Sequence, residues 1–245
     1  MRRSWDSYRL LLTWQVLRYR ALLPMLIVIQ VLLAVGVVYG LSLLVPHIDT
    51  STALYLATGA PTLTLILLGL TVVPQEVSQA RVSGRHDYVV SLPVPRLAPL
   101  AAEITFWLAV QIPGTVLALV VAALRFDIGL HVSWAVAPAI ALVALTGASV
   151  GYALAATLRP EVTNHVTSFV SVAILLFSPI NFPAHRMPAG LRAAHRVLPV
   201  QYMADVIRGS LTGRYADAAG LAFTVVALWC VAGLAVSYRA ATRQS

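Results

Sequence analysis

The sequence predicts an all-α integral membrane protein with six transmembrane helices and both termini on the cytoplasmic side. Hydrophobic residues make up 59% of the chain and charged residues only 11%, whereas soluble domains carry about 25% charged residues. Six long stretches lack Arg, Asp and Glu, and roughly 20 apolar residues in a helix span the hydrocarbon core of a bilayer. These stretches occur in every third of the chain, so we expect one transmembrane domain over residues 1–245.

The predicted spans cover, in approximate bounds, residues 22–45, 53–74, 102–124, 134–157, 163–183 and 217–238. Helices are expected because lipid offers no hydrogen-bond partner to an exposed backbone. Five prolines fall within or near these spans, namely Pro24, Pro61, Pro113, Pro138 and Pro179. Membrane helices tolerate proline because neighbouring groups satisfy the freed carbonyls. These prolines therefore do not count against the assignment of the spans.

The arginine distribution predicts the orientation. All 17 basic residues are Arg, and the cytoplasmic connections of membrane proteins are enriched in basic residues. With the N-terminus inside, eleven Arg lie on the cytoplasmic side and six on the outer side. The net charge of +8 therefore indicates a lipid membrane as the partner and no nucleic acid.

The N-terminal residues 3–20 predict a helix that lies in the membrane interface. Trp5, Tyr8, Leu12, Val16 and Tyr19 recur at spacings of three and four, so they are expected to share one face. The alternative is a cytoplasmic flank that only orients the first span. The first apolar run is too long for the core of a cleavable signal.

Residues 75–92 form the longest polar connection on the predicted cytoplasmic side, and we expect a short helix there. Gly84 interrupts the segment, and Pro93 and Pro95 close it. Charged side chains beside a few exposed apolar ones suit docking of a soluble partner. The alternative is a solvated loop. The charged residues are Glu76, Arg81, Arg85 and Asp87.

Residues 184–215 form a basic outer loop, in which we expect a hairpin of two short amphipathic helices separated by Pro199. The expected apolar faces are Leu191, Ala194 and Leu198 in the first helix and Met203, Val206, Ile207 and Leu211 in the second. The opposite faces carry Arg192, His195 and Arg196, then Gln201, Asp205 and Arg208. We expect these arginine side chains to extend to water from the outer leaflet.

Catalytic and metal-binding patterns are missing from the sequence. The phosphate-binding motif G-x-x-x-x-G-K-[ST] needs a Lys, and the chain contains none. No two of the six histidines are four residues apart, and there is no G-x-S-x-G motif. We therefore expect no catalytic residue, no metal and no cofactor bound by this chain; if ATP and Mg²⁺ drive it, a partner chain binds them.

Polar residues within the spans are candidates for a substrate path. The fifth span carries Asn164, Thr167, Ser168, Ser171 and Ser178, and the second carries Thr64, Thr71 and Gln75. Helical spacing places Asn164, Ser168 and Ser171 near one face. The alternative is that these hydroxyl groups only hydrogen bond within and between helices.

Two local motifs resemble those of a known family, the permease subunits of type-2 ABC exporters. The first runs through Gly84, Asp87, Leu92, Pro93 and Arg96 towards the third span. The second runs from Leu198-Pro199-Val200-Gln201-Tyr202 to Arg208, ahead of the last span. The resemblance covers nearly the whole chain, although Glu103 stands where the family often has Lys.

The resemblance implies a permease in the cell membrane that moves a drug, lipid or polysaccharide-type substrate outward. It implies two permease chains, alike or different, around a central path lined by spans two and five, with ATPase subunits docked on cytoplasmic coupling helices. The coupling residues would be Glu76, Arg81, Gly84, Arg85, Asp87, Pro93 and Arg96. The path residues would be Thr64, Thr71, Asn164, Thr167, Ser168 and Ser171. The outer re-entrant hairpin would hold Pro199, Tyr202, Asp205 and Arg208.

Two other functions remain open at this point. A secondary transporter or channel would need buried ionisable residues or an internal repeat. An integral-membrane enzyme would need His, Asp or Glu clustered at one depth. The sequence offers neither pattern.

Overall fold

The computed structural model describes residues 2–44, 50–95, 97–126, 134–184, 187–212 and 216–243. Within these residues the regular structure is helical and contains no strand, which confirms the all-α prediction. The helices are α1 (Arg2–Tyr19), α2 (Leu23–Leu44), α3 (Thr50–Leu67), the π-helix η1 (Leu68–Val72), α4 (Val73–Val82), α5 (Arg85–Ser91), α6 (Leu97–Phe126), α7 (Val136–Thr157), α8 (Pro160–Phe177), α9 (Ala189–His195), α10 (Pro199–Thr212) and α11 (Ala216–Arg243).

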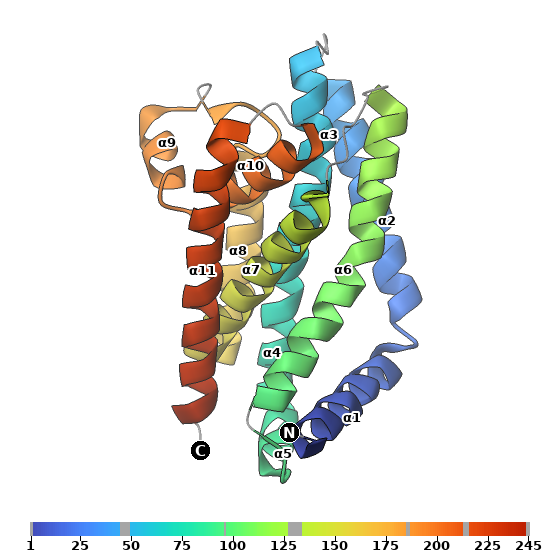
Figure 1. Cartoon of the computed structure of the whole chain (residues 1–245), viewed down its shortest axis with the longest axis vertical. Coiled ribbons are helices and arrows are strands. Elements are labelled where there is room, and N and C mark those ends of the chain that lie inside the picture. The colour runs from blue at the N-terminus through green and yellow to red at the C-terminus, as the bar shows by residue number, and fades with distance from the viewer. Residues whose placement is uncertain are drawn as a thin grey trace.

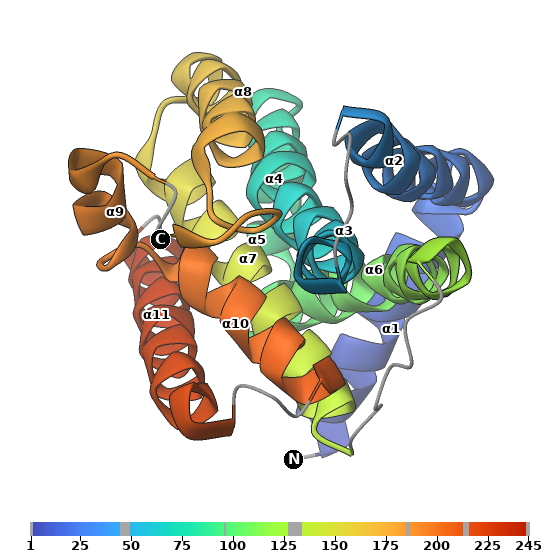
Figure 2. The same cartoon turned by 90° about the horizontal axis from the view of Figure 1, so that it is seen from above.

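The long helices run between two ends of an elongated bundle (Figure 1). One end, which we name the α5 end, holds α1, α5 and both chain termini. The opposite end, named the α10 end, holds α9 and α10. Seen from above, α10 crosses over α7 between α3 and α11, and α8 lies at the edge of the bundle beside α4 (Figure 2).

Among the described residues, five helical segments are long and apolar enough to cross a membrane. They are Leu23–Gly40, Thr52–Val82, Leu97–Phe126, Val136–Thr157 and Gly220–Ala240. The fifth predicted span corresponds to α8, which is not among them and whose first turns carry Glu161, Asn164 and His165.

Helix α8 ends at Phe177, so the prediction that this span continues to residue 183 is wrong. Ser178 is extended, with ψ at 147°. The ring of Pro179 disfavours helical geometry in the residue before it. Pro179 therefore ends the helix instead of kinking it.

The second predicted span is part of a longer, irregular helix made of α3, η1 and α4. In η1 the N–H of Val73 donates to the carbonyl of Leu68, five residues earlier, and Pro74 follows without an N–H of its own. The wider π turn changes the angular position of all later residues around the helix axis. Thr64 precedes this turn and Thr71 lies within it, so regular helical spacing does not apply between them.

Helix α1 packs on α6 through aromatic side chains. Tyr19 stacks on Phe106 with ring centroids 5.1 Å apart and meets Trp107 edge-on at 5.5 Å. The buried residues of α1 are Leu11, Gln15 and Tyr19, whereas Trp5 and Val16 of the predicted face are exposed. The predicted α1 helix is confirmed, but its packing face is rotated from the prediction.

Candidate coupling and transport sites

The polar segment at the α5 end is divided by a sharp turn at Gly84. This glycine has a φ of +70°, the left-handed conformation that favours glycine over other residues. Helix α4 ends at Val82 and α5 begins at Arg85. The prediction of one helix over residues 75–92 is therefore corrected to two helices, because the turn redirects the chain.

Glu76 on α4 accepts contacts from two other segments. The hydroxyl of Tyr19 donates a hydrogen bond to its carboxylate. The guanidinium groups of Arg18 and Arg85 lie 3.8 and 3.9 Å from the same oxygen. Burial, followed by the hydrogen bond to Glu76, raises the pKa of Tyr19, so its phenol stays neutral and acts as the donor. Glu76 thus connects α4 to α1 and to the start of α5.

Arg81 connects α4 to the end of α7. Its Nη1 atom donates to the carbonyls of Ala155 and Leu158 at 2.6 and 2.9 Å. Carbonyls at the end of a helix lack partners within the helix and carry partial negative charge, so a cation is favourable there. The hydroxyl of Ser78 adds a hydrogen bond of 3.0 Å to the carbonyl of Pro160.

The predicted coupling residues therefore divide into two groups. Glu76, Arg81 and Arg85 have partners inside the chain. Asp87 and Pro93 are exposed, as is the turn residue Gly84, and Tyr88 on α5 is 63% exposed. Arg96 lies outside the described residues.

The predicted polar stripe on α8 follows the boundary between packed and exposed surface. Thr167 is buried, and Ser171 hydrogen bonds to both Thr71 on η1 and the carbonyl of Thr167. Asn164 and Ser168 are exposed on the same helix. Among the predicted stripe residues, Asn164 and Ser168 are therefore the exposed ones, and we name them the polar edge of α8. Thr64, in contrast, is buried, and its hydroxyl donates a hydrogen bond to the carbonyl of Ala60 on its own helix.

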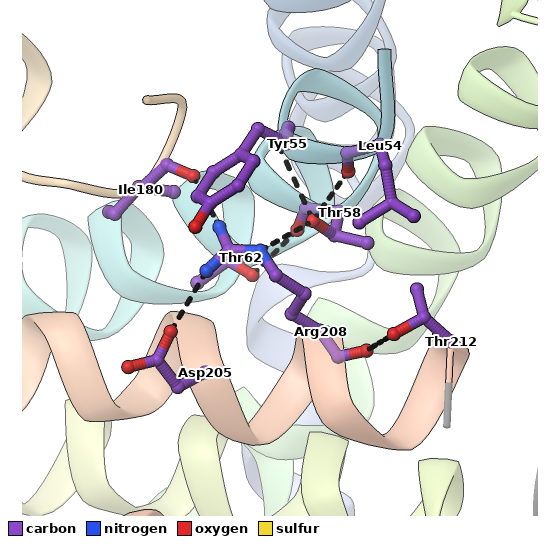
Figure 3. A network of polar contacts seen from close by, with 8 residues as sticks. All are labelled: Leu54, Tyr55, Thr58, Thr62, Ile180, Asp205, Arg208 and Thr212. Atoms are coloured by element: carbon purple, nitrogen blue, oxygen red, sulfur yellow. Dashed lines mark hydrogen bonds and ion pairs between the residues drawn. The ribbon is translucent and has the colours of Figure 1, made fainter. Parts of the chain in front are cut away.

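At the α10 end, Arg208 is buried, with 1% of its surface exposed. Figure 3 shows its polar contacts. Its Nη1 atom lies 2.9 Å from the carboxylate of Asp205. Its Nη2 donates to the carbonyl of Ile180 at 2.8 Å, and its Nε donates to Thr58 at 3.3 Å. The guanidinium carbon also lies 3.9 Å from the ring centroid of Tyr55.

The expectation that Arg208 extends to water is therefore wrong. A buried charge is tolerated when it is paired and its N–H groups are hydrogen bonded, and both conditions hold here. The aromatic face of Tyr55 adds a cation–π contact. Sequence spacing placed Arg208 on the polar face of its helix but did not reveal that α3 covers this face.

The other hairpin residues stabilise the connection between α9 and α10. Pro199 is buried at the first position of α10, and the hydroxyl of Tyr202 donates to the carbonyl of Arg196 at 2.9 Å. His195 is buried, with Nδ1 2.9 Å from the carbonyl of Leu191. Ala194 and Leu198, which were expected to face inward, are exposed. The predicted face of the first helix is thus wrong.

Several contact residues carry no marker in the sequence. Ile180 contributes a backbone carbonyl to Arg208, and a carbonyl has no residue-specific signature. Tyr55 and Thr58 lie on α3, about 150 residues from Arg208. Among the described residues, no group of three His, Cys, Asp or Glu side chains could hold a metal ion.

Comparison with known proteins gives one family. The family model described as "ABC-2 family transporter protein" matches residues 43–239, from the end of α2 through most of α11. No curated protein matches the chain. With the apolar helices described above, this match identifies a multi-pass membrane protein of the ABC-type permease class. The chain therefore belongs to the ABC-2 family of transporter proteins.

Proposed function

We propose that this chain is the membrane subunit of an ATP-driven exporter and that a separate chain hydrolyses the ATP. Membrane proteins of this family typically work with an ATPase subunit, and their membrane domains are generally non-catalytic. The observation that carries the proposal is the separation of the two ends in Figure 1: α1, α5 and both termini at one, α9 and α10 at the other. This polarity suits an ATPase on one side and substrate release on the other.

The proposal includes six crossings, with the α5 end in the cytoplasm. Two termini at the same end require an even number of crossings, and α8 supplies the sixth to the five apolar segments. The arginine distribution supports a cytoplasmic location for both termini. The hairpin of α9 and α10 then lies on the outer side, within the outer half of the membrane of the cell.

The ATPase docks on α5 in this proposal. Asp87 and Tyr88 offer an exposed charge and an exposed aromatic ring, a combination suited to a protein interface. Glu76 and Arg81 would act behind that surface, because they tie the adjoining α4 to α1 and α7. A displacement of α5 would therefore be transmitted to α4 and α7. ATP and Mg²⁺ would be bound by the partner.

The substrate path lies along the exposed edge of α8 and is completed by a second permease chain, alike or different. Polar side chains at membrane depth face protein or water rather than lipid. Asn164 and Ser168 are exposed in the single chain, so a passage between two chains would cover them. The expected substrates are a drug, a lipid or a polysaccharide-type molecule.

Co-purification tests this function. The tagged chain is isolated from its native membrane in mild detergent, and bound proteins are identified by mass spectrometry. We expect an ATPase subunit in constant proportion and vanadate-sensitive ATP hydrolysis by the complex. A matched preparation with α5 shortened to a Gly-Ser turn controls for non-specific capture. Substrate movement driven by an ion gradient in a chain that binds no ATPase would favour a secondary transporter or channel instead.

A further inference from the structure

Arg208 joins three segments that are far apart in the sequence. Each of its nitrogen atoms contacts a different group (Figure 3): Nε contacts Thr58 on α3, Nη2 contacts Ile180 in the turn after α8, and Nη1 contacts Asp205 on α10. The planar guanidinium directs its N–H groups along fixed directions. One side chain therefore sets the relative positions of α3, α10 and the turn after α8.

Helix α10 has a second, apolar attachment to the bundle. Met203, Val206, Ile207 and Leu211 are buried in the core that α10 shares with α3, α7 and α11. This attachment fixes α10 independently of Arg208. Ile180 in the turn after α8 belongs to the same core, so the guanidinium adds a polar connection between two segments that also share apolar packing.

The turn after α8 lies directly on α3. A Cβ atom added at Gly59 would come within 3.1 Å of Cγ of Asn181 and 3.0 Å of the carbonyl oxygen of Ile180. The absence of a side chain at Gly59 thus permits the close approach. Ile180 itself is fully buried, and its carbonyl accepts the hydrogen bond from Arg208. Arg208 and Gly59 act on the same turn from two sides.

We propose that Arg208 is a positioning residue that holds the turn after α8 against α3, so that α3, α10 and this turn form one rigid unit. The inference rests on the proposed function for its consequence: α8 carries the polar edge of the path, and Arg208 fixes the turn in which the outer end of this helix is anchored. The path would then open by movement of this unit as a whole, and not by separation of the turn from α3.

A pair of cysteines reports the contact directly. In a Cys230→Ser background, Gly59→Cys and Asn181→Cys place two thiols within disulfide range, because the Cβ at position 59 lies 3.1 Å from the Cγ position of residue 181. Replacing Asn181 also removes the amide that would contact a residue at 59, and the remaining contact of 3.0 Å with the carbonyl of Ile180 is common to all the proteins compared. The rate of disulfide formation under mild oxidation then reports the fraction of time that the turn lies on α3.

Arg208→Met in this pair should slow disulfide formation by about tenfold or more, since the loss of hydrogen bonds from a buried charge has at least this effect on an equilibrium. Arg208→Lys should also slow it, because an ammonium lacks the planar fork; this variant keeps the charge and guards against misfolding of the methionine variant. Arg196→Met is the matched control, because Arg196 is exposed, and should not change the rate. Equal rates in all four proteins would overturn the proposal.

Function provides the second readout. The complex carrying the cysteine pair and Arg208 should retain vanadate-sensitive ATP hydrolysis when oxidised, because the unit stays closed throughout the cycle. With Arg208→Met, hydrolysis should be impaired in the reduced state and restored by oxidation, a rescue that a general loss of stability would not permit. Loss of hydrolysis on oxidation of the Arg208 parent would show that the turn must leave α3 and would overturn the proposal. If the parent binds no ATPase, the proposed function fails, while the disulfide rates still decide the role of Arg208.

Discussion

Gly69 on η1 packs directly against Gly147 on α7. A Cβ atom at position 69 would lie 2.6 Å from the carbonyl carbon of Gly147, 2.8 Å from its Cα and 2.9 Å from the nitrogen of Ala148. All three are backbone atoms, which cannot rotate away as a side chain does. The absence of a side chain at Gly69 thus permits α7 to lie closer to the long helix than any other residue would allow.

Substitution of Gly69 should therefore destabilise the bundle. We expect Gly69→Ala to lower the free energy of unfolding by about 1–3 kcal/mol, because an added methyl group must displace α7. A thermal unfolding curve of the purified chain in detergent measures the effect. Gly36→Ala is the control, since nothing lies within 4 Å of a Cβ at that position. Equal melting temperatures for the two variants would contradict the close packing.

Charge changes at the α5 end should separate docking from internal packing. Asp87→Arg alters an exposed residue, so we expect stability within about 0.5 kcal/mol of the parent. Its co-purified ATPase should fall by about tenfold, the effect of roughly 1.4 kcal/mol lost at an interface. Comparison of bound ATPase per mole of chain makes the measurement, and undiminished association would remove α5 from the interface.

Arg81→Gln, in contrast to Asp87→Arg, should lower the stability of the chain itself. The variant loses the cation that caps the carbonyls of Ala155 and Leu158, so we expect stability to fall by about 1–2 kcal/mol. The reduction should appear in the thermal unfolding of the chain without its ATPase. If Arg81→Gln unfolds like the parent and only ATPase binding falls, Arg81 contacts the partner directly.

The exposed and the packed residues of the α8 stripe should respond differently to substitution by apolar residues. Ser168→Leu changes an exposed side chain and should obstruct the path, with transport by the assembled complex falling sharply and its yield unchanged. Ser171→Val removes the hydrogen bond to Thr71, worth about 0.6–2 kcal/mol in a membrane, and should lower the melting temperature. Transport per assembled complex is measured for both in proteoliposomes. Normal transport by Ser168→Leu would exclude this edge from the path.

Cysteine labelling tests the orientation of the two ends. In a Cys230→Ser background, Arg196→Cys is exposed near α9 and Tyr88→Cys is exposed on α5. We expect a membrane-impermeant maleimide to label position 196 in intact cells and position 88 only after permeabilisation. His195 is a poor reporter because it is buried. Labelling of both positions from the same side would rule out the proposed topology.

The prediction of the fold was most accurate where a single segment contains the signal. The predicted spans at 22–45, 102–124, 134–157 and 217–238 each coincide with a helix, because an apolar stretch of sufficient length is a local property. The end of α8 was missed because Pro179 was expected to be tolerated inside a span. The π turn was missed because it arises where α7 approaches at Gly69, a contact between distant segments.

Composition and local pattern alone determined that this chain is a helical membrane protein, that Gly84 interrupts the polar segment after the second span, and that the chain carries no phosphate-binding lysine. These features depend on the residues of one segment and on their affinity for lipid or water. The tertiary structure decided which polar residues are exposed and which form hydrogen bonds or ion pairs inside the chain. In the sequence, Arg208 and Arg81 cannot be distinguished from an exposed arginine. Arg208 connects segments within the chain because α3 packs beside it, and Arg81 does so because the end of α7 packs beside it. The distant partners are the hydroxyl of Thr58, 150 residues from Arg208, and the carbonyl of Ala155, 74 residues from Arg81. No local pattern records such contacts.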